Sequence, residues 1–377
     1  MTMPDGTVPG GVRGVMKALK RRLSDSHGRR PTVGLVGYFG WGNYGDELFV
    51  QVWQQELGDD FDLRVLPDLQ GKPYFSAGID AALRGVDAVL IGGGDLVIPW
   101  QLSELYWRRE YLRVPVFIAG VGVPTSQQPK PHVVQRLAEF FGHPNVKYIH
   151  ARDPESQEWI QRQLTPQVSV HEGPDLACAL DFPAAPVSSD KVLGIVTREI
   201  RRHRDRVQRT DVDPAEAQQY DFLRDIAESM SQEGYEIRHI VLGAGKIGAD
   251  DLADAQWADL PHARILHTAS IDEMTSMLAS CTALVTMKFH GAVVATMYGI
   301  PSFSFVAPGK PLSAKRVNFM RRIDRLDLVA PMSSLECVRA LTGANGIDPS
   351  SVDMLRESSR TCISALRDEM RTVLLRR

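Results

Sequence analysis

The chain has 377 residues, of which 44% are apolar and 24% charged, and its net charge is −3 at pH 7. This length predicts two domains, each with its own core. The balanced charge excludes a whole-protein attraction to nucleic acid. Four scattered cysteines without a C-x-x-C pair or a signal peptide indicate reduced thiols in a cytoplasm, and no apolar run approaches the ~20 residues of a membrane span.

The leader, residues 1–30, is locally basic. Within residues 12–23, apolar side chains recur at helical spacing and are surrounded by arginines and lysines. A basic amphipathic helix of this kind can rest on an anionic membrane, which would make the protein peripheral at the inner membrane face. A solvated leader, disordered or packed by one face on the body, is the simpler interpretation, and we favour it.

Beyond the leader, strand-like and helix-like patterns alternate, which predicts two α/β units with mostly parallel sheets. We expect an N-terminal domain over residues 31–180, a Pro- and Ser-rich linker over 181–190, a C-terminal domain over 191–345 and a helical tail over 346–377. In such a fold the ligand cleft lies between the domains, at the carboxyl ends of the strands.

The strands of the first unit are expected at Thr32–Val36, Leu63–Leu66, Ala88–Ile91, Val116–Ala119 and Val146–His150, and its helices near Asp46–Leu57, Ala77–Arg84, Ser103–Arg113, Val133–Phe141 and Pro154–Gln163. The strands of the second unit are expected at Val192–Val196, Glu236–Leu242, Arg264–His267, Ala283–Met287 and Ser302–Val306, and its helices near Ala215–Glu233, Ile271–Ala279 and Gly291–Tyr298.

The loop after the first strand, Gly37–Asp46, is rich in glycine and places Asp46 in the first turn of a helix. Backbone N–H groups at such a junction suit a phosphate or a carboxylate, whereas the Asp46 carboxylate equally suits a sugar hydroxyl. Gly40–Gly45 also has the G-x-G-x-x-G spacing of dinucleotide-binding loops. The bulk of Trp41 and Tyr44 argues against that interpretation.

Two further loops of the first unit follow strands. Gly92-Gly93-Gly94-Asp95 ends the third strand and allows a ligand or the opposite domain to approach the backbone closely. Arg152 follows the fifth strand, next to Asp153, which can cap the helix that Pro154 opens. Arg152 could face the cleft or pair with a nearby carboxylate, and the sequence leaves both open.

The second unit supplies cations at its strand ends. Arg198 follows the first strand and precedes an arginine-rich run, and its planar guanidinium matches carboxylate and phosphate oxygens. Lys288 and His290 lie where a buried strand passes into a helix, which makes His290 a candidate for acid–base chemistry. Lys310 offers a further cation at the same sheet edge. No motif supports a metal site, a nucleophile elbow or a P-loop.

Together these motifs resemble the polysaccharide pyruvyl transferase family. The resemblance rests on Gly37-x-x-Gly40 through Asn43-x-Gly45-Asp46-Glu47, then Gly92-Gly93-Gly94, Arg152-Asp153-x-x-Ser156, Lys288-x-His290-Gly291 and Gly299-x-Pro301. It covers about residues 32–325. The family more often has Arg-x-His, so Lys288 is a departure that keeps the charge and loses the bidentate fork.

The resemblance implies two Rossmann-like domains of the GT-B type and transfer of the enolpyruvyl-derived group of phosphoenolpyruvate onto two hydroxyls of a glycan or glycolipid. The product would be a pyruvate ketal, and no metal or other cofactor is expected. We expect His290 as the acid and Asp46 as the residue that orients or deprotonates the acceptor. The donor would contact Lys288, Arg198, Arg152 and Lys310, and the loops on the acceptor side would contribute Gly40, Asn43, Gly45, Gly93, Gly94 and Asp95.

Two alternatives belong to other classes. A GT-B glycosyltransferase that uses a nucleotide sugar would share the fold and the cationic second domain. It would typically need an acidic residue near a late strand for the ribose, and none follows Ser302–Val306. A non-catalytic carbohydrate-binding protein would not need Asp46, Lys288 and His290 together. The acceptor sugar, the ketal stereochemistry and the oligomeric state are not readable from the sequence.

Overall fold

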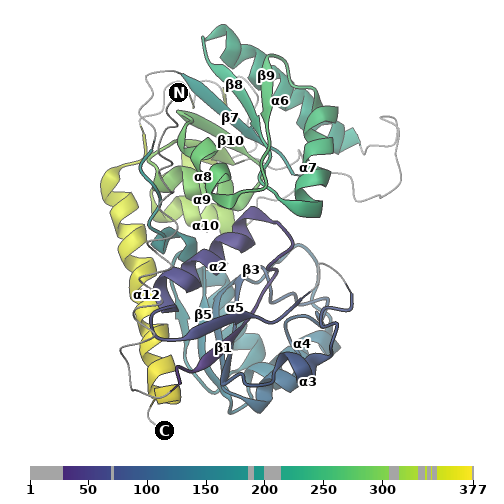
Figure 1. Cartoon of the computed structure of the whole chain (residues 1–377). Coiled ribbons are helices and arrows are strands. Elements are labelled where there is room, and N and C mark those ends of the chain that lie inside the picture. The colour runs from purple at the N-terminus through teal and green to yellow at the C-terminus, as the bar shows by residue number, and fades with distance from the viewer. Residues whose placement is uncertain are drawn as a thin grey trace, which may run out of the picture.

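The computed structural model describes residues 29–68, 72–185, 191–198, 214–304, 314–329, 336–337, 341 and 346–375. Two parallel sheets, each covered by helices on both faces, lie one above the other (Figure 1). We call the unit built on the first sheet the N-terminal domain and the other the C-terminal domain. Residues 12–23 of the leader and the end of the proposed linker lie outside the described residues.

The first sheet has six strands in the spatial order β2-β1-β3-β4-β5-β6. The strands are β1 (Thr32–Val36), β2 (Asp62–Val65), β3 (Ala88–Gly94), β4 (Val116–Val121), β5 (Val146–Ala151) and β6 (Val170–Glu172). Its helical elements are α2 (Tyr44–Leu57), α3 (Ile79–Ala82), η1 (Arg109–Arg113), α4 (Pro131–Phe141), α5 (Pro154–Leu164) and η2 (Leu176–Ala179). Alternate residues of β3 enter different cores, which explains its continuous apolar run.

The second sheet has five strands in the order β11-β10-β7-β8-β9. The strands are β7 (Val192–Val196), β8 (Glu236–Ile240), β9 (Ala263–Leu266), β10 (Ala283–Thr286) and β11 (Ser302–Ser304). The helical elements that follow them are α6 (Pro214–Gln232), α7 (Gly245–Ala258), α8 (Ile271–Ala279), α9 (Phe289–Met297), α10 (Ala314–Arg322), η4 (Leu326–Leu328) and α12 (Pro349–Leu375). Across these described elements, none of the helices combines the length and apolar character needed to span a bilayer.

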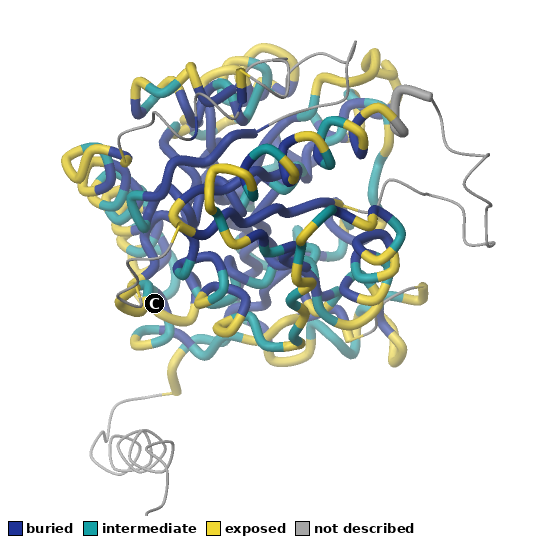
Figure 2. The backbone as a smooth tube through the Cα atoms, turned by 90° about the horizontal axis from the view of Figure 1, so that it is seen from above, coloured by how far each residue is buried: buried dark blue, intermediate teal, exposed yellow. Residues whose placement is uncertain are grey.

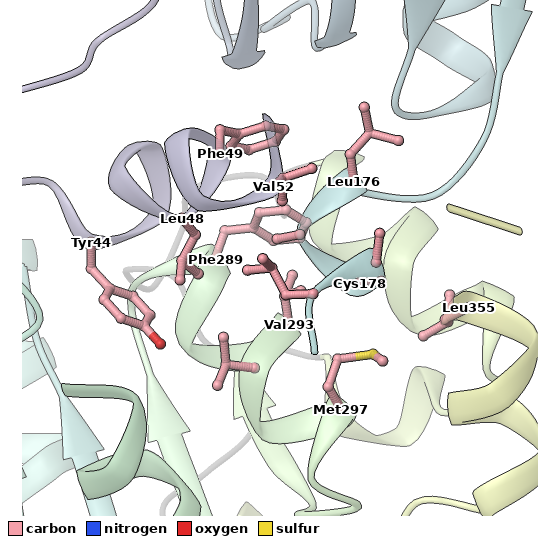
Figure 3. Packing of buried hydrophobic residues seen from close by; sticks show 14 of the residues in the cluster. Tyr44, Leu48, Phe49, Val52, Leu176, Cys178, Phe289, Val293, Met297 and Leu355 are labelled. Atoms are coloured by element: carbon pink, nitrogen blue, oxygen red, sulfur yellow. The ribbon is translucent and has the colours of Figure 1, made fainter. Parts of the chain in front are cut away.

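One apolar core joins the two domains. It contains side chains of α2 and η2 from the first domain and of α8, α9 and α12 from the second half of the chain. Figure 3 shows Leu48 and Val52 of α2 facing Val293 and the neighbouring residues of α9. The Tyr44 hydroxyl also lies 2.7 Å from the Thr275 hydroxyl of α8. The domains are therefore packed together through a shared interior as well as through the linker.

The last helix, α12, returns to the N-terminal domain. It runs along one side of the molecule and spans both domains (Figure 1). Arg367 and Arg371 each lie 2.8 Å from a carboxylate of the first domain, on Glu56 and Asp60 respectively. Leu366 of the same helix is fully buried in the shared core. Figure 2 shows the buried segments gathered in the interior of the molecule and the exposed ones at its periphery. This helix thus fastens the C-terminal half of the chain to the first sheet.

Most predicted strands and helices are confirmed within two to three residues. The helix predicted over Ser103–Arg113 is wrong, because only the short η1 turn forms there. Tertiary contacts decide this segment: the Trp107 indole donates to the Leu96 carbonyl at 3.1 Å and the Tyr111 hydroxyl to the Leu105 carbonyl at 2.9 Å. β6, α7 and α10 were not predicted from the sequence patterns. Asp153 caps α5 as predicted, accepting from the Ser156 N–H at 2.7 Å.

Truncation of the buried side of α12 should destabilise the protein. Leu366→Ala leaves a cavity in the shared core, and we expect it to lower the free energy of unfolding by about 2–5 kcal/mol. Met354 lies on the same helix and is 42% exposed. The matched change Met354→Ala should cost less than about 0.5 kcal/mol. Urea denaturation of both variants measures the difference, and equal effects would contradict the docking of α12.

Candidate active site

The strand orders place the site. In the first sheet β2 lies on one side of β1, and β3 and the later strands lie on the other. The loops after β1 and β3 therefore diverge, and the gap between them is a topological switch point. In the second sheet the same holds for β7 and β10. Asp46 and Asp95 follow the first pair of strands, and Arg198 and Lys288 follow the second pair. Both switch points open into one cleft between the domains.

This cleft has a volume of about 1110 Å³. Its lining from the N-terminal domain includes Tyr38, Asn43, Gly45, Tyr106, Thr125 and Ser126 beside the carboxylates of Asp46, Asp95, Asp153 and Glu155, and we call this side the aromatic wall. Its lining from the C-terminal domain includes Arg198, Lys288, Lys315 and Arg316, and we call this side the cationic wall. The two walls therefore suit ligands of different charge. Among the described residues, no group of three His, Cys, Asp or Glu side chains is arranged to hold a metal ion.

Two guanidinium groups lie close together on the cationic wall. Burial, together with the nearby charge of Arg198, lowers the pKa of Arg316 to about 10. The Arg316 side chain also donates a hydrogen bond to the carbonyl of Met287, at the end of β10. Like charges in a partly buried site repel each other, so an anion placed between them would be stabilised.

Lys288 is held by its own domain. Its ammonium donates to the Leu242 carbonyl at 2.7 Å and pairs with the buried Asp251 of α7. The side chain is only 13% exposed. Lysine at this position therefore reaches a carboxylate that the sequence did not connect with it. An incoming anion would share Lys288 with Asp251.

Arg152 lies at the centre of a buried ion network. Its side chain is 2% exposed, and it pairs with Asp95, while Asp153 and Asp175 lie 4.0 and 3.8 Å away. Asp95 also accepts from the Lys315 ammonium at 2.6 Å, which joins the two walls. Burial opposes ionisation of Asp95, but the charges of Arg152 and Lys315 hold its pKa below the ordinary value. Asp95 is thus a stable anion.

Asp46 has the opposite electrostatic environment. It is 7% exposed at the start of α2, where the Asn43 side chain donates to it. Burial raises the pKa of Asp46 from 3.8 to about 6, although Asn43 and the charge of His290 act in the other direction. A carboxylate with such a pKa can exchange a proton near neutral pH, as a general base requires.

His290 faces Asp46 from the second residue of α9. Its ring is 12% exposed, packs edge-on against Phe49 with 5.8 Å between centroids, and lies with Nε2 3.5 Å from Oδ2 of Asp175. A Cβ atom at Gly45 would lie 1.8 Å from Nδ1 of this ring. Only glycine at position 45 therefore lets α2 approach the imidazole so closely.

The structure brings most of the predicted site residues to this cleft. Its lining includes Asp46, His290, Lys288, Arg198, Arg152, Asn43, Gly45, Gly94 and Asp95. Gly40 and Gly93 are not part of the lining, and Gly93 instead faces the ring of Phe49. Lys310 lies outside the described residues. The structure thus groups the residues predicted to act on donor and acceptor.

Sequence reasoning missed several lining residues. Lys315 and Arg316 lie on α10, and the adjacent cations of a Lys-Arg pair shortly after the last strand were an available signal. Asp175, which does not line the cleft but lies against His290, follows the unrecognised strand β6, just after a Gly-Pro pair. Tyr38 stands in the first loop but was not considered as a cleft residue.

Comparison with solved structures defines the class of fold. MnaA of S. aureus in complex with UDP shares 11% identity at a TM-score of 0.54, covering 90% of this chain and 96% of that one. The UDP-GlcNAc 2-epimerase of Methanocaldococcus jannaschii shares 9% sequence identity at a TM-score of 0.51, and the match covers 90% of this chain and 99% of that one. A variant of the wall teichoic acid polymerase TagF shares 11% sequence identity at a TM-score of 0.50, and the match covers 97% of each chain. The protein has the GT-B fold of two Rossmann-like domains around a cleft.

The family follows from the sequence. The family model of polysaccharide pyruvyl transferase matches residues 43–307, most of the chain, whereas curated proteins give no match. The chain belongs to the polysaccharide pyruvyl transferase family and is a transferase. The matched region begins at Asn43 and includes every described cleft residue named above except Tyr38, Lys315 and Arg316.

The buried Asp46 should destabilise the fold above pH 6. Its pKa is about 6 in the folded protein against 3.8 ordinarily, so the folded state binds the proton more tightly and loses stability as pH rises from about 4 to 6. Asp46→Asn removes this loss. We expect the variant to be more stable than the wild type at pH 7–8 by on the order of 1–3 kcal/mol, with little difference at pH 4. Thermal melting across this pH range measures it, and a pH-independent difference would contradict the raised pKa.

A side chain at position 45 should collide with His290. We expect Gly45→Ala to destabilise the protein by about 1–3 kcal/mol, because the buried ring has little room to move. In a His290→Ala background the same change should cost less or stabilise α2, since alanine favours a helix over glycine by about 1 kcal/mol. A double-mutant cycle by chemical denaturation measures this coupling. Additive effects would contradict the contact.

Proposed function

We propose that the protein transfers the enolpyruvyl-derived group of phosphoenolpyruvate onto two hydroxyls of a glycan or glycolipid, giving a cyclic pyruvate ketal and inorganic phosphate. The observation that carries the proposal is the cleft itself. The cationic wall faces the aromatic wall, which presents tyrosines and carboxylates, and Asp46 and His290 line the same cleft from the two sides. The family to which the chain belongs points to the same class of reaction.

The donor fits the cationic wall. Phosphoenolpyruvate carries a phosphate and a carboxylate, and this wall presents Arg198, Arg316, Lys288 and Lys315. Guanidinium groups match both anions through paired hydrogen bonds. An anion near Arg198 and Arg316 would counteract both the burial and the repulsion that lower the pKa of Arg316. Arg152 contributes indirectly, because its charge is already shared among buried carboxylates.

The acceptor fits the aromatic wall. Tyr38 and Tyr106 line it, and Thr125 and Ser126 add hydroxyl groups. Aromatic rings offer flat apolar faces with a polar edge, which suits the stacked ring and outward hydroxyls of a neutral sugar. Asp46 lies on the same wall, where it can accept a proton from an acceptor hydroxyl. Arg152 is the single cation that the described residues of this domain add to the lining, and it is buried and paired.

The chemistry then follows in two steps. His290 donates a proton to the methylene carbon of the enol, and C2 becomes electron-poor. The oxygen of one acceptor hydroxyl bonds to C2 while its proton passes to Asp46. The second hydroxyl bonds to C2 as the bond from C2 to the phosphate oxygen breaks, and phosphate leaves with that electron pair and the second proton. The proton on Asp46 restores His290.

Ligand-dependent melting tests the donor first. A ligand that binds only the folded state raises the melting temperature, and at 100 times its Kd it adds about 2.7 kcal/mol. We expect a shift with phosphoenolpyruvate that weakens in Arg198→Ala and Lys288→Ala. The control is Arg264→Ala, an exposed arginine of β9 outside the cleft lining. A shift with nucleotide sugars alone would contradict the proposal in favour of glycosyl transfer.

Turnover is measured as phosphate release in the presence of carbohydrate acceptors. We expect His290→Gln and Asp46→Asn each to lower kcat on the order of 10²–10⁴-fold.

A further inference from the structure

Asp175 is a buried carboxylate of the N-terminal domain that lies against His290. It precedes η2, its side chain is 1% exposed, and its Oδ1 accepts from the Ala177 N–H at 3.0 Å. The other oxygen, Oδ2, points elsewhere. It lies 3.5 Å from Nε2 of His290 and 3.8 Å from Nη1 of Arg152. One carboxylate thus fastens a turn with one oxygen and faces the imidazole with the other.

Oδ2 of Asp175 and Nε2 of His290 complement each other. Both atoms are shielded from solvent, and neither has a closer hydrogen-bond partner among the residues that the structure describes. A buried polar atom without a hydrogen-bond partner raises the free energy of the folded state. A hydrogen bond between these two atoms, which needs only a slightly shorter distance than 3.5 Å, is therefore favourable. Burial alone would raise the pKa of Asp175, but His290 and Arg152 hold it below the ordinary value. Asp175 is therefore an ionised acceptor.

We propose that Asp175 is the positioning residue of His290: it accepts a hydrogen bond from Nε2–H and so directs Nδ1 of the ring to the substrate. The acid role of His290 in this inference rests on the proposed function. With Nε2 turned to Asp175, the opposite edge of the ring lies over Gly45, which lines the cleft. Glycine at position 45 leaves that edge uncovered by a side chain.

The proton transfer uses this arrangement. Before transfer the imidazolium carries protons on both nitrogens, and Asp175 stabilises its charge. Nδ1 gives its proton to the methylene carbon, the C–H bond forms from the electron pair of the double bond, and the ring becomes the neutral Nε2–H tautomer. Other charged groups that act on this site are Asp46 of α2, Asp95 after β3, Arg152 after β5 and Lys315 of α10.

Asp175 is held firmly enough for this task. Its backbone carbonyl accepts from the Ser359 hydroxyl of α12 at 3.2 Å. The following residues, Leu176 to Ala179, are buried in the core shared by the two domains (Figure 3). A carboxylate on a packed turn keeps its direction, whereas one on an exposed loop would not.

Nitrogen NMR of the imidazole tests the proposal without a measurement of enzymatic activity. Uniformly ¹⁵N-labelled protein, with the signal assigned by its loss in His290→Gln, should show the neutral ring of His290 as the Nε2–H tautomer. In Asp175→Asn the amide keeps the cap on η2 through its oxygen and presents N–H groups to the ring. The neutral ring should then change to the Nδ1–H tautomer or a mixture. A wild-type ring in the Nδ1–H form would overturn the proposal.

A matched variant separates position from charge. Asp153 also caps a helix with Oδ1 and also lies within 4.0 Å of Arg152, but Asp175 is the carboxylate of this pair that approaches His290. Asp153→Asn should leave the tautomer of His290 unchanged. An equal change in both variants would show that the loss of a carboxylate beside Arg152, and not contact with His290, controls the ring.

Kinetics give the second readout. If the proposed reaction is observed, Asp175→Asn should lower kcat on the order of 10²–10⁴-fold with the KM for phosphoenolpyruvate changed less than about threefold. Asp153→Asn should lower kcat by far less. A wild-type protein that shows the Nε2–H tautomer but transfers no pyruvyl group would contradict the proposed function and leave the positioning of His290 by Asp175 intact. An unchanged kcat in Asp175→Asn would contradict the positioning role.

Discussion

The contact between α2 and α9 is the constraint on which the rest of the structure depends. Each helix starts at a switch point of its own sheet, and the two pack together inside a core common to both domains. Their first turns meet where Gly45 faces His290, so the backbone of one domain comes against a functional side chain of the other. Packing energy of the apolar residues that follow, such as Leu48 and Val293, therefore fixes the geometry of the polar groups.

This constraint explains why the site is at the domain boundary. Parallel strands bring their carboxyl ends to one edge of a sheet, and each sheet alone supplies only some of the residues of the site. The first sheet contributes carboxylates and aromatic rings, whereas the second contributes cations and the imidazole. The return of α12 to the first domain restricts relative movement, because Arg367 and Arg371 of this helix pair with Glu56 and Asp60 of the first domain. A site divided in this way needs such a fastening.

The sequence predicted the loops better than the partners of their residues. Parallel sheets place every loop after a strand at one edge, so Asp46, Arg198 and His290 could be grouped from local patterns alone. Ion pairs across long stretches of chain have no such pattern. Asp251 lies 37 residues before Lys288, and Asp175 lies 115 residues before His290. The sequence left Arg152 either facing the cleft or paired with a carboxylate, and in the structure it pairs with Asp95 while also lining the cleft.

The missed elements have a related cause. β6 has three residues, too few to show a period. α10 is rich in basic residues, a composition that also suits a surface loop. Lys315 and Arg316 therefore had one weak sequence signal, their adjacent positions shortly after the last strand, and tertiary packing brings them to the cleft. The wrong helix over Ser103–Arg113 is the converse case, since its helical pattern was overridden by buried hydrogen bonds of Trp107 and Tyr111.

The charges of the cleft divide its carboxylates into two kinds. Arg152 and Lys315 keep Asp95 ionised, and Arg152 with His290 does the same for Asp175, so both serve as fixed counter-ions. Among the residues that the structure describes, none places a guanidinium or ammonium group in an ion pair with Asp46, and burial raises its pKa instead. When one site moves the pKa values of its carboxyl groups apart, the group with the raised value is the one suited to proton exchange. The buried arginine therefore acts through its neighbours: by keeping the other carboxylates charged, it leaves Asp46 as the carboxyl group suited to be the proposed base beside His290, the proposed acid.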